Sequence, residues 1–178
     1  MNLRIETEKD YNEITELIKK AFLSAKVTDG EEHHLVDRIR KSDEYVPELS
    51  YVVENGNGLV GHIMFSQVKI EDEANEMSHL SLALAPVSVL PEYRNQGIGK
   101  MMIREAIENA QKLGYGSILA LGYPEYYSKF GFRKAKIFDV KAPFKDAEDF
   151  LMALELNEDS LKNVQGKVIY SKAFFPEK

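Results

Sequence analysis

The fold is decided by residues 80–121, which read LSLALAPVSVLPEYRNQGIGKMMIREAIENAQKLGYGSILAL. This pattern predicts a strand up to Leu90, a tight turn, an amphipathic helix and a second strand over residues 117–121. Pro86 cannot donate to a strand ladder, so it indicates a bulge or a sheet edge. Gly114 is placed to end the helix. A strand, a helix and a strand in this order predict a right-handed parallel unit. The apolar face of the helix consists of Met102, Ile103, Ala106, Ile107, Ala110 and Leu113.

The turn before this helix, RNQGIG at residues 94–99, is typical of an anion-binding site. Its glycines and the first helical turn leave several backbone N–H groups free at the positive end of the helix dipole. Two common phosphate motifs do not fit. A P-loop would need glycine in place of Arg94 and Ser or Thr in place of Met101, and a dinucleotide fingerprint would need a small residue in place of Met102. The sequence therefore predicts an anion site of another kind.

A second informative segment, GYPEYYSKFGF, covers residues 122–132. Pro124 suits the first position of a short helix, and Gly131 is placed to end it. The segment therefore puts two adjacent tyrosines, Tyr126 and Tyr127, on a short helix directly after the second strand.

The two segments together carry a family resemblance. The pattern R-x-x-G-x-G after a bulged strand, within VLPEYRNQGIG at residues 89–99, resembles that of the GNAT family of N-acetyltransferases. The segment GYPEYYSKFGF resembles the YhbS-like branch of that family, and the resemblance covers most of the chain. It implies an α/β (α+β) fold with a central splayed mixed β-sheet flanked by helices. It also implies a single N-acetyltransferase domain over residues 1–178, in which residues 142–178 extend the sheet.

The same resemblance implies a reaction, in which acetyl-CoA donates its acetyl group directly to a primary amine of a small molecule or peptide in a ternary complex. The turn would hold the pyrophosphate, and the bulged strand would pair with the pantetheine arm and polarise the thioester carbonyl. Tyr127, four residues before Gly131, would be the general acid toward the CoA sulfur, whereas Tyr126 stands where the family often has an apolar packing residue. The implied cofactor-binding residues are Val87, Ser88, Val89, Arg94, Asn95, Gln96, Gly97, Ile98, Gly99 and Lys100.

The sequence does not determine which group is the base that takes the proton of the amine. We prefer Glu32, because the helix over residues 31–41 is implied to flank the acceptor cleft. His62 is more readily explained as a hydrogen-bonded residue of a strand. No metal site is expected, since adjacent histidines on a helix point about 100° apart and two-histidine zinc sites use a spacing of four. The other candidates are Glu31, His33, His34, His79 or a relay of a carbonyl group and water.

Composition narrows the classes of protein further. The chain has 178 residues, no cysteine and a net charge of −6. Without cysteine there is no disulfide and no thiolate nucleophile, so an acetyl-enzyme would need a less usual nucleophile. The acidic balance argues against a general affinity for nucleic acid. The sequence has no apolar run of membrane-spanning length and begins with charged residues, so we expect a cytoplasmic protein without a membrane partner. We expect it to be a monomer or a homodimer.

An alternative hypothesis from a different functional class uses the same pocket. A non-catalytic module that senses acyl-CoA would need the anion-binding turn and the bulged strand but no acid for the leaving group. Tyr127 therefore favours the enzyme.

The rest of the chain gives weaker signals. Helices are expected after Asp10 and over residues 31–41, and strands over residues 3–6, from Phe150 and over residues 167–170. A hairpin is expected over residues 50–54 and 59–70, followed by an acidic loop at 71–77. Simple alternation places Val60, His62 and Met64 on one face of its second strand.

Overall fold

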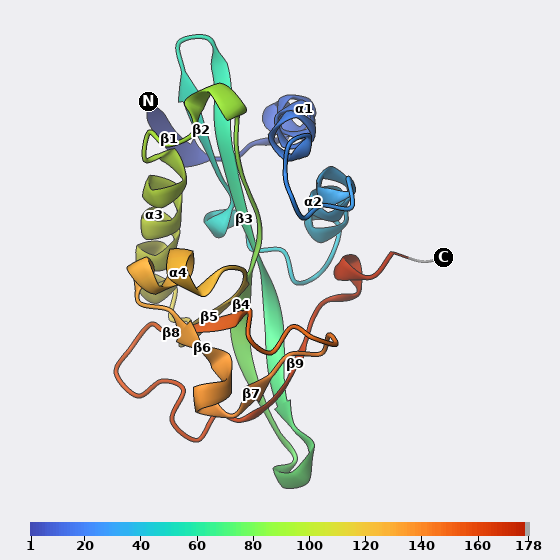
Figure 1. Cartoon of the computed structure of the whole chain (residues 1–178), viewed down its shortest axis with the longest axis vertical. Helices are drawn as coiled ribbons and strands as arrows, with labels where there is room; N and C mark the ends of the chain where they lie inside the picture. Colours follow the sequence, from blue (N-terminus) through green and yellow to red (C-terminus); the bar gives the residue numbers. More distant parts are fainter. Residues whose placement is uncertain (177–178) are drawn as a thin grey trace.

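The computed structural model describes residues 1–176, within which nine strands form one mixed sheet (Figure 1). The helices are α1 (Tyr11–Phe22), α2 (Glu32–Arg40), α3 (Ile98–Lys112) and α4 (Pro124–Tyr127). The strands are β1 (Asn2–Ile5), β2 (Tyr51–Asn55), β3 (Gly58–Asp72), β4 (Met77–Val89), β5 (Ser117–Leu121), β6 (Arg133–Lys134), β7 (Val140–Lys141), β8 (Leu151–Glu155) and β9 (Gly166–Ile169).

The sheet runs in the order β1-β2-β3-β4-β5-β8-β6, and β9 pairs with both β3 and β7. The central pair β4–β5 is parallel, as the strand–helix–strand pattern predicts, and its neighbours are antiparallel. Helix α3 lies on one face of the sheet, and α1 and α2 lie on the other (Figure 1). The expected mixed sheet flanked by helices is therefore confirmed.

A bulge in β4 shapes the centre of the sheet. Ile63 of β3 pairs with Val87 and Phe65 pairs with Leu84, so one residue of β3 faces both Ala85 and Pro86. The bulge expected at Pro86 is thus confirmed. The β4–β5 ladder contains only the pairs Leu82–Ile118 and Ala83–Leu119. The two strands diverge beyond these pairs, which leaves the last residues of β4 without a neighbour on the β5 side.

The hairpin of β3 and β4 is longer than expected. The expected loop at 71–77 is only a turn at residues 73–76, because β3 continues to Asp72 and β4 begins at Met77 (the lower end of Figure 1). The outermost pairs have neither face fully buried, so no apolar alternation marks them as strand. The turn is closed by the Asp72 side chain, which accepts a hydrogen bond from the Asn75 N–H.

The prediction that Val60 shares a face with His62 and Met64 is wrong, because a second bulge lies at the start of β3. Val53 pairs with Gly61 and Glu54 pairs with Leu59, so Val60 is the extra residue. Val60 packs in the core under α3, whereas Met64 packs under α1 and α2. A shift of one residue moves a side chain to the other face, which is what happens at this position.

The core lies on both faces of the sheet. On one face α3 packs against β2 to β5, and on the other α1 and α2 cover β2, β3 and the bulge of β4. The C-terminal segment covers the lower part of the second face, with Leu161, Val168 and Tyr170 in that core. Each strand near the bulge is therefore held from two sides.

A buried polar network joins α2 to the sheet. The Glu6 carboxylate accepts hydrogen bonds from Arg40 Nε and Nη2, both at 2.9 Å, and from the Tyr45 hydroxyl at 2.9 Å. His62 Nε2 lies 2.9 Å from Glu6 Oε2, and the imidazole is fully buried. The expectation that His62 is a hydrogen-bonded strand residue is confirmed.

Two groups of the network, Glu6 and His62, have lowered pKa values. Burial alone would raise the pKa of Glu6, but the hydrogen bonds from His62 and Arg40 outweigh it and lower that pKa to about 2. Burial lowers the pKa of His62 below its ordinary value, against the opposing effect of Glu6. The stable state of the network is therefore a carboxylate, a guanidinium and a neutral imidazole that donates from Nε2.

We predict that the free energy of unfolding decreases as the pH falls below 6.5. Below its ordinary pKa of 6.5, His62 binds a proton more readily in the unfolded chain than in the folded chain. Its contribution to the free energy of unfolding is therefore fully present above pH 6.5 and is lost as the pH falls. The loss should be at most about 1 kcal/mol between pH 7 and pH 5.5. Glu6 adds a second loss between its unfolded pKa of 4.5 and about 2. Urea unfolding at several pH values measures both.

The matched variants are His62→Gln and His34→Gln. The first keeps a donor toward Glu6 but removes the titrating group, so the loss between pH 6.5 and 4.5 should shrink. The second removes an exposed histidine of α2 and should leave the slope unchanged. Equal slopes in His62→Gln and the unmodified protein would contradict the assignment.

Candidate functional site

The turn between β4 and α3 exposes a run of backbone amides. Asn95 and Gly97 adopt left-handed backbone conformations, with φ of +60° and +83°, and α3 begins at Ile98. The first helical bond of this segment runs from the Met101 N–H to the Gly97 carbonyl. Within residues 1–176, no acceptor takes a hydrogen bond from the N–H groups of residues 95–100. Six consecutive donors at the positive end of α3 are thus open to an anion.

The open edge of β4 leads directly into this turn. The Leu90 N–H donates to the Val60 carbonyl at 3.0 Å. Because antiparallel bonding alternates, Ser88 directs its main-chain groups to β3, whereas Val87 and Val89 direct theirs to the β5 side. The Ser88 side chain is buried, and its hydroxyl has no partner in the described chain. Of the three predicted strand residues, Val87 and Val89 therefore direct main-chain groups to the open side, where the Val89 carbonyl already accepts a hydrogen bond from Arg94.

Arg94 is turned toward α1. Its guanidinium donates to the Ala21 carbonyl, to the Ser24 hydroxyl at 3.2 Å and, through Nε, to the Val89 carbonyl at 3.4 Å. A cation suits this place, because the carbonyl end of a helix is negative. The side chain ties the turn to the end of α1 and to β4, which its residue type alone did not reveal.

Helix α4 carries the two tyrosines to the gap between β4 and β5. The Tyr127 ring packs on the backbone of Gly122, where an added Cβ would lie 2.3 Å from a ring carbon. It also meets the ring of Phe132 at a centroid distance of 5.4 Å. Burial, with a smaller effect of Tyr126, raises the pKa of Tyr127 well above its ordinary value, so the phenol keeps its proton at neutral pH. The sequence did not indicate that Gly122 makes room for the Tyr127 ring; its only signal was its position directly after a predicted strand.

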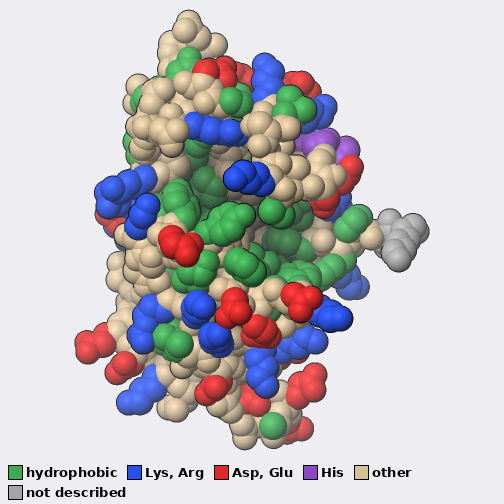
Figure 2. All heavy atoms as spheres, in the orientation of Figure 1, with side chains coloured by type: hydrophobic (Ala, Val, Ile, Leu, Met, Phe, Trp, Pro, Cys, Tyr) green, Lys and Arg blue, Asp and Glu red, His purple; other side chains and the backbone are tan. Residues whose placement is uncertain are grey.

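A hollow of about 540 Å³ opens beside Tyr127. Hydrophobic side chains gather in the middle of this face of the molecule, where the surface is hollowed (Figure 2). None of the lining residues is charged, and the Tyr126 hydroxyl lies near Gly99 of the turn. Helix α4 thus brings the turn with its open amides and Tyr127 together. The hollow is lined by Val27, Leu121, Gly122, Tyr123, Tyr126, Tyr127 and Phe150.

The predicted base, Glu32, lies in an adjoining hollow of about 530 Å³. Val27 lines both hollows, so Glu32 and Tyr127 lie on two sides of this loop residue. The Glu32 carboxylate accepts a hydrogen bond from the Thr28 hydroxyl.

Two of the alternative bases are poorly placed, because His62 is buried and His79 lies far along β4 from Val87. His62 is buried in the Glu6 network, and His79 pairs with Ile70 near the far end of the β3–β4 hairpin. Val87 lies eight positions further along β4 than His79, which is roughly 26 Å along a strand. His34 is exposed and lies 3.7 Å from a Glu31 carboxylate oxygen.

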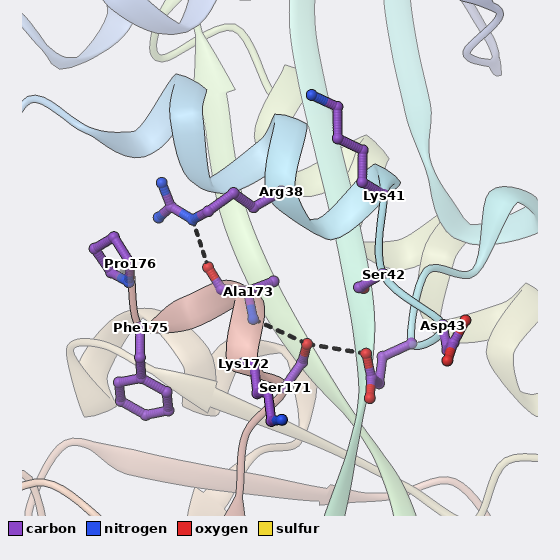
Figure 3. A pocket seen from close by; sticks show the side chains of 10 residues that line it. Arg38, Lys41, Ser42, Asp43, Ser171, Lys172, Ala173, Phe175 and Pro176 are labelled. Atoms are coloured by element: carbon purple, nitrogen blue, oxygen red, sulfur yellow. Dashed lines mark hydrogen bonds between the residues drawn. The ribbon is translucent and has the colours of Figure 1, made fainter. Parts of the chain in front are cut away.

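A larger hollow, of about 930 Å³, lies between the end of α2 and the C-terminal segment (Figure 3). Arg38 Nε donates to the Ala173 carbonyl at 2.7 Å, and the Ser171 hydroxyl donates to Glu44 at 3.0 Å. These bonds fasten the tail to α2 and to the segment that follows it. Neither the turn nor Tyr127 lines this hollow, so it is separate from the candidate site.

Two further features are missing from the described residues. In the part of the chain that the structure describes, no group of three or more His, Cys, Asp or Glu side chains is arranged to hold a metal ion. Among residues 1–176, no helix combines the length and apolar character needed to cross a bilayer.

Comparison with known proteins identifies the family. The model of the acetyltransferase (GNAT) domain matches residues 47–134. YhbS of Escherichia coli, described as an N-acetyltransferase, is 27% identical over 98% of both chains, and its crystal structure with CoA superposes with a TM-score of 0.86 over 97% of this chain and 91% of that one. A GNAT family acetyltransferase from Brucella melitensis, solved with acetyl-CoA, is 30% identical over 97% of both chains with a TM-score of 0.77. The E. coli N-acetyltransferase YjhQ is 32% identical over 72% of this chain and 67% of its own length. The chain therefore belongs to the GNAT family of acetyltransferases.

Proposed function

We propose that this chain transfers an acetyl group from acetyl-CoA to a primary amine of a small molecule or peptide, directly, in a ternary complex. The observation that carries the proposal is the run of six open amides at residues 95–100 beside the free edge of β4. The related structures from E. coli and B. melitensis, which hold CoA and acetyl-CoA, support the choice of donor. We also propose one catalytic domain over residues 1–178, extended by residues 142–178, in a cytoplasmic monomer or homodimer.

The donor would be held at two places. The amides of Asn95, Gln96, Gly97, Ile98, Gly99 and Lys100 would bind the diphosphate, with Arg94 fixing the turn. The edge of β4 would pair with the pantetheine arm through the main chain of Val87 and Val89, with Ser88 between them. A main-chain N–H of this edge would polarise the thioester carbonyl.

The reaction then exchanges one bond for another. The amine nitrogen attacks the carbonyl carbon, a C–N bond forms and the C–S bond breaks. The nitrogen loses one proton and the sulfur gains one. Tyr127 supplies the proton to the sulfur, and burial suits it for this role because it keeps the phenol protonated. Glu32 takes the proton of the amine from the adjoining hollow, which shares Val27 with the hollow beside Tyr127.

The turn is tested with Gly97→Ala. Gly97 and Gly114 lie at the two ends of α3, both have left-handed φ (+83° and +89°), and an added Cβ would contact nothing within 4 Å at either. Each alanine variant should lose about 1 kcal/mol of stability from backbone strain. Only Gly97→Ala should also weaken CoA binding, roughly tenfold, because it misaligns the amides. Calorimetric titration with CoA measures this, and equal affinities in the two variants would contradict the site.

The acid is tested with Tyr127→Phe. We expect thiol release from acetyl-CoA with a panel of amines to fall about 100-fold, while CoA affinity changes less than about twofold. Tyr115→Phe, which removes a hydroxyl bonded to Gln67 at the other end of β5, is the control and should keep its rate. An unchanged rate in Tyr127→Phe would exclude this tyrosine as the acid, and CoA binding without turnover of any amine would favour an acyl-CoA sensor.

The base is tested with Glu32→Gln against Glu31→Gln. The two residues are neighbours at the start of α2, and Glu31 is exposed. Glu32→Gln should lower the rate about 100-fold at pH 7 and regain part of it at higher pH, where the amine loses its proton without help. Glu31→Gln should show neither effect. Equal behaviour of the two variants would leave the role to another group, such as a relay of a carbonyl and water.

A further inference from the structure

Tyr126 joins the two halves of the candidate site. Its ring meets the rings of Tyr127 and Phe130 edge-on, at centroid distances of 5.2 Å and 5.4 Å. Its hydroxyl lies over the first turn of α3, 3.4 Å from the position that a Cβ on Gly99 would occupy. The side chain is 40% exposed and lines the hollow beside Tyr127. Two aromatic contacts therefore fix the ring while the hydroxyl faces the turn.

The hydroxyl has no assigned bond. In residues 1–176 it makes no hydrogen bond, although it lies next to the open amides of residues 95–100. Burial raises the pKa of Tyr126, so the group keeps its proton and can donate. A phenylalanine would make the same two ring contacts. Packing therefore explains the ring of Tyr126 but leaves its hydroxyl without a role.

We propose that the Tyr126 hydroxyl donates a hydrogen bond to the diphosphate of the donor, beside the amide of Gly99. This inference rests on the proposed function, which places the diphosphate on the turn. An anion on these amides lies beside the hydroxyl, and a hydrogen bond to a charged oxygen is stronger than one between neutral groups. Because the same ring packs on Tyr127, Tyr126 acts as a positioning residue that fixes the diphosphate relative to the acid.

The test compares two donors on two variants. Tyr126→Phe should weaken CoA binding about tenfold in calorimetric titration, the loss of one hydrogen bond to a charged group. With acetyl-CoA the value of kcat/KM should fall by a similar factor. With acetyl-pantetheine, which has the thioester but no diphosphate, kcat/KM should stay the same. Tyr93→Phe is the control, since its hydroxyl lies just before the turn but is bonded to Asn55 at 2.9 Å, and it should bind CoA as the unmodified protein does.

The outcomes separate this inference from the proposed function. Unchanged CoA affinity in Tyr126→Phe, or an equal loss with acetyl-CoA and acetyl-pantetheine, would overturn the inference alone. The second result would place the effect at Tyr127 or at the pantetheine arm. If the unmodified protein bound no CoA, the proposed function would fall and the inference with it. Thermal unfolding of each variant shows whether the fold is intact, and the acetyl-pantetheine rate reports independently on an assembled site.

Discussion

The site depends on one constraint, that β4 cannot follow β5 beyond Ala83. The bulge at Ala85 and Pro86 redirects the strand, while β3 still holds it along its other edge. Side chains of β4 pack in the cores on both faces of the sheet, Leu82 in one and Ala85 in the other. The open edge is therefore a fixed feature of the sheet. Because the turn follows β4 and α4 follows β5, both reach the mouth of the same gap.

Much of this region could be predicted because its signals are local. A proline marks the bulge, and glycines mark the left-handed residues at Gly97 and Gly114. These residue types limit the backbone wherever the chain goes. The face of Val60 and the length of the β3–β4 hairpin could not be predicted in the same way. Both depend on how one strand pairs with another, and a bulge or an exposed pair leaves no trace in simple alternation.

The main-chain part of the site was more predictable than its side chains. Free amides follow from the start of a helix, whatever surrounds it. The direction of Arg94 depends on the Ala21 carbonyl, which α1 contributes some seventy residues earlier in the chain. The neighbourhood of Glu32 depends on the loop that carries Val27. The close fit of Tyr127 on Gly122 is likewise a contact in space. Residue type indicated which groups were candidates, but only tertiary packing decides what each one faces.

The two halves of the site have opposite electrostatic character. Six amides without protein acceptors are tolerated because most of the turn is exposed, apart from the buried residue Ile98, and water can complete their bonds. A ligand must replace that water with concentrated negative charge. The hollow beside Tyr127 is uncharged and partly shielded, and an anion would be costly there. A ligand that satisfies both places has an anionic group joined to an uncharged arm, and α4 fixes the separation, because Tyr126 spans from Gly99 to Tyr127. Free phosphate meets only the first condition and a simple thioester only the second, whereas an acyl-CoA meets both.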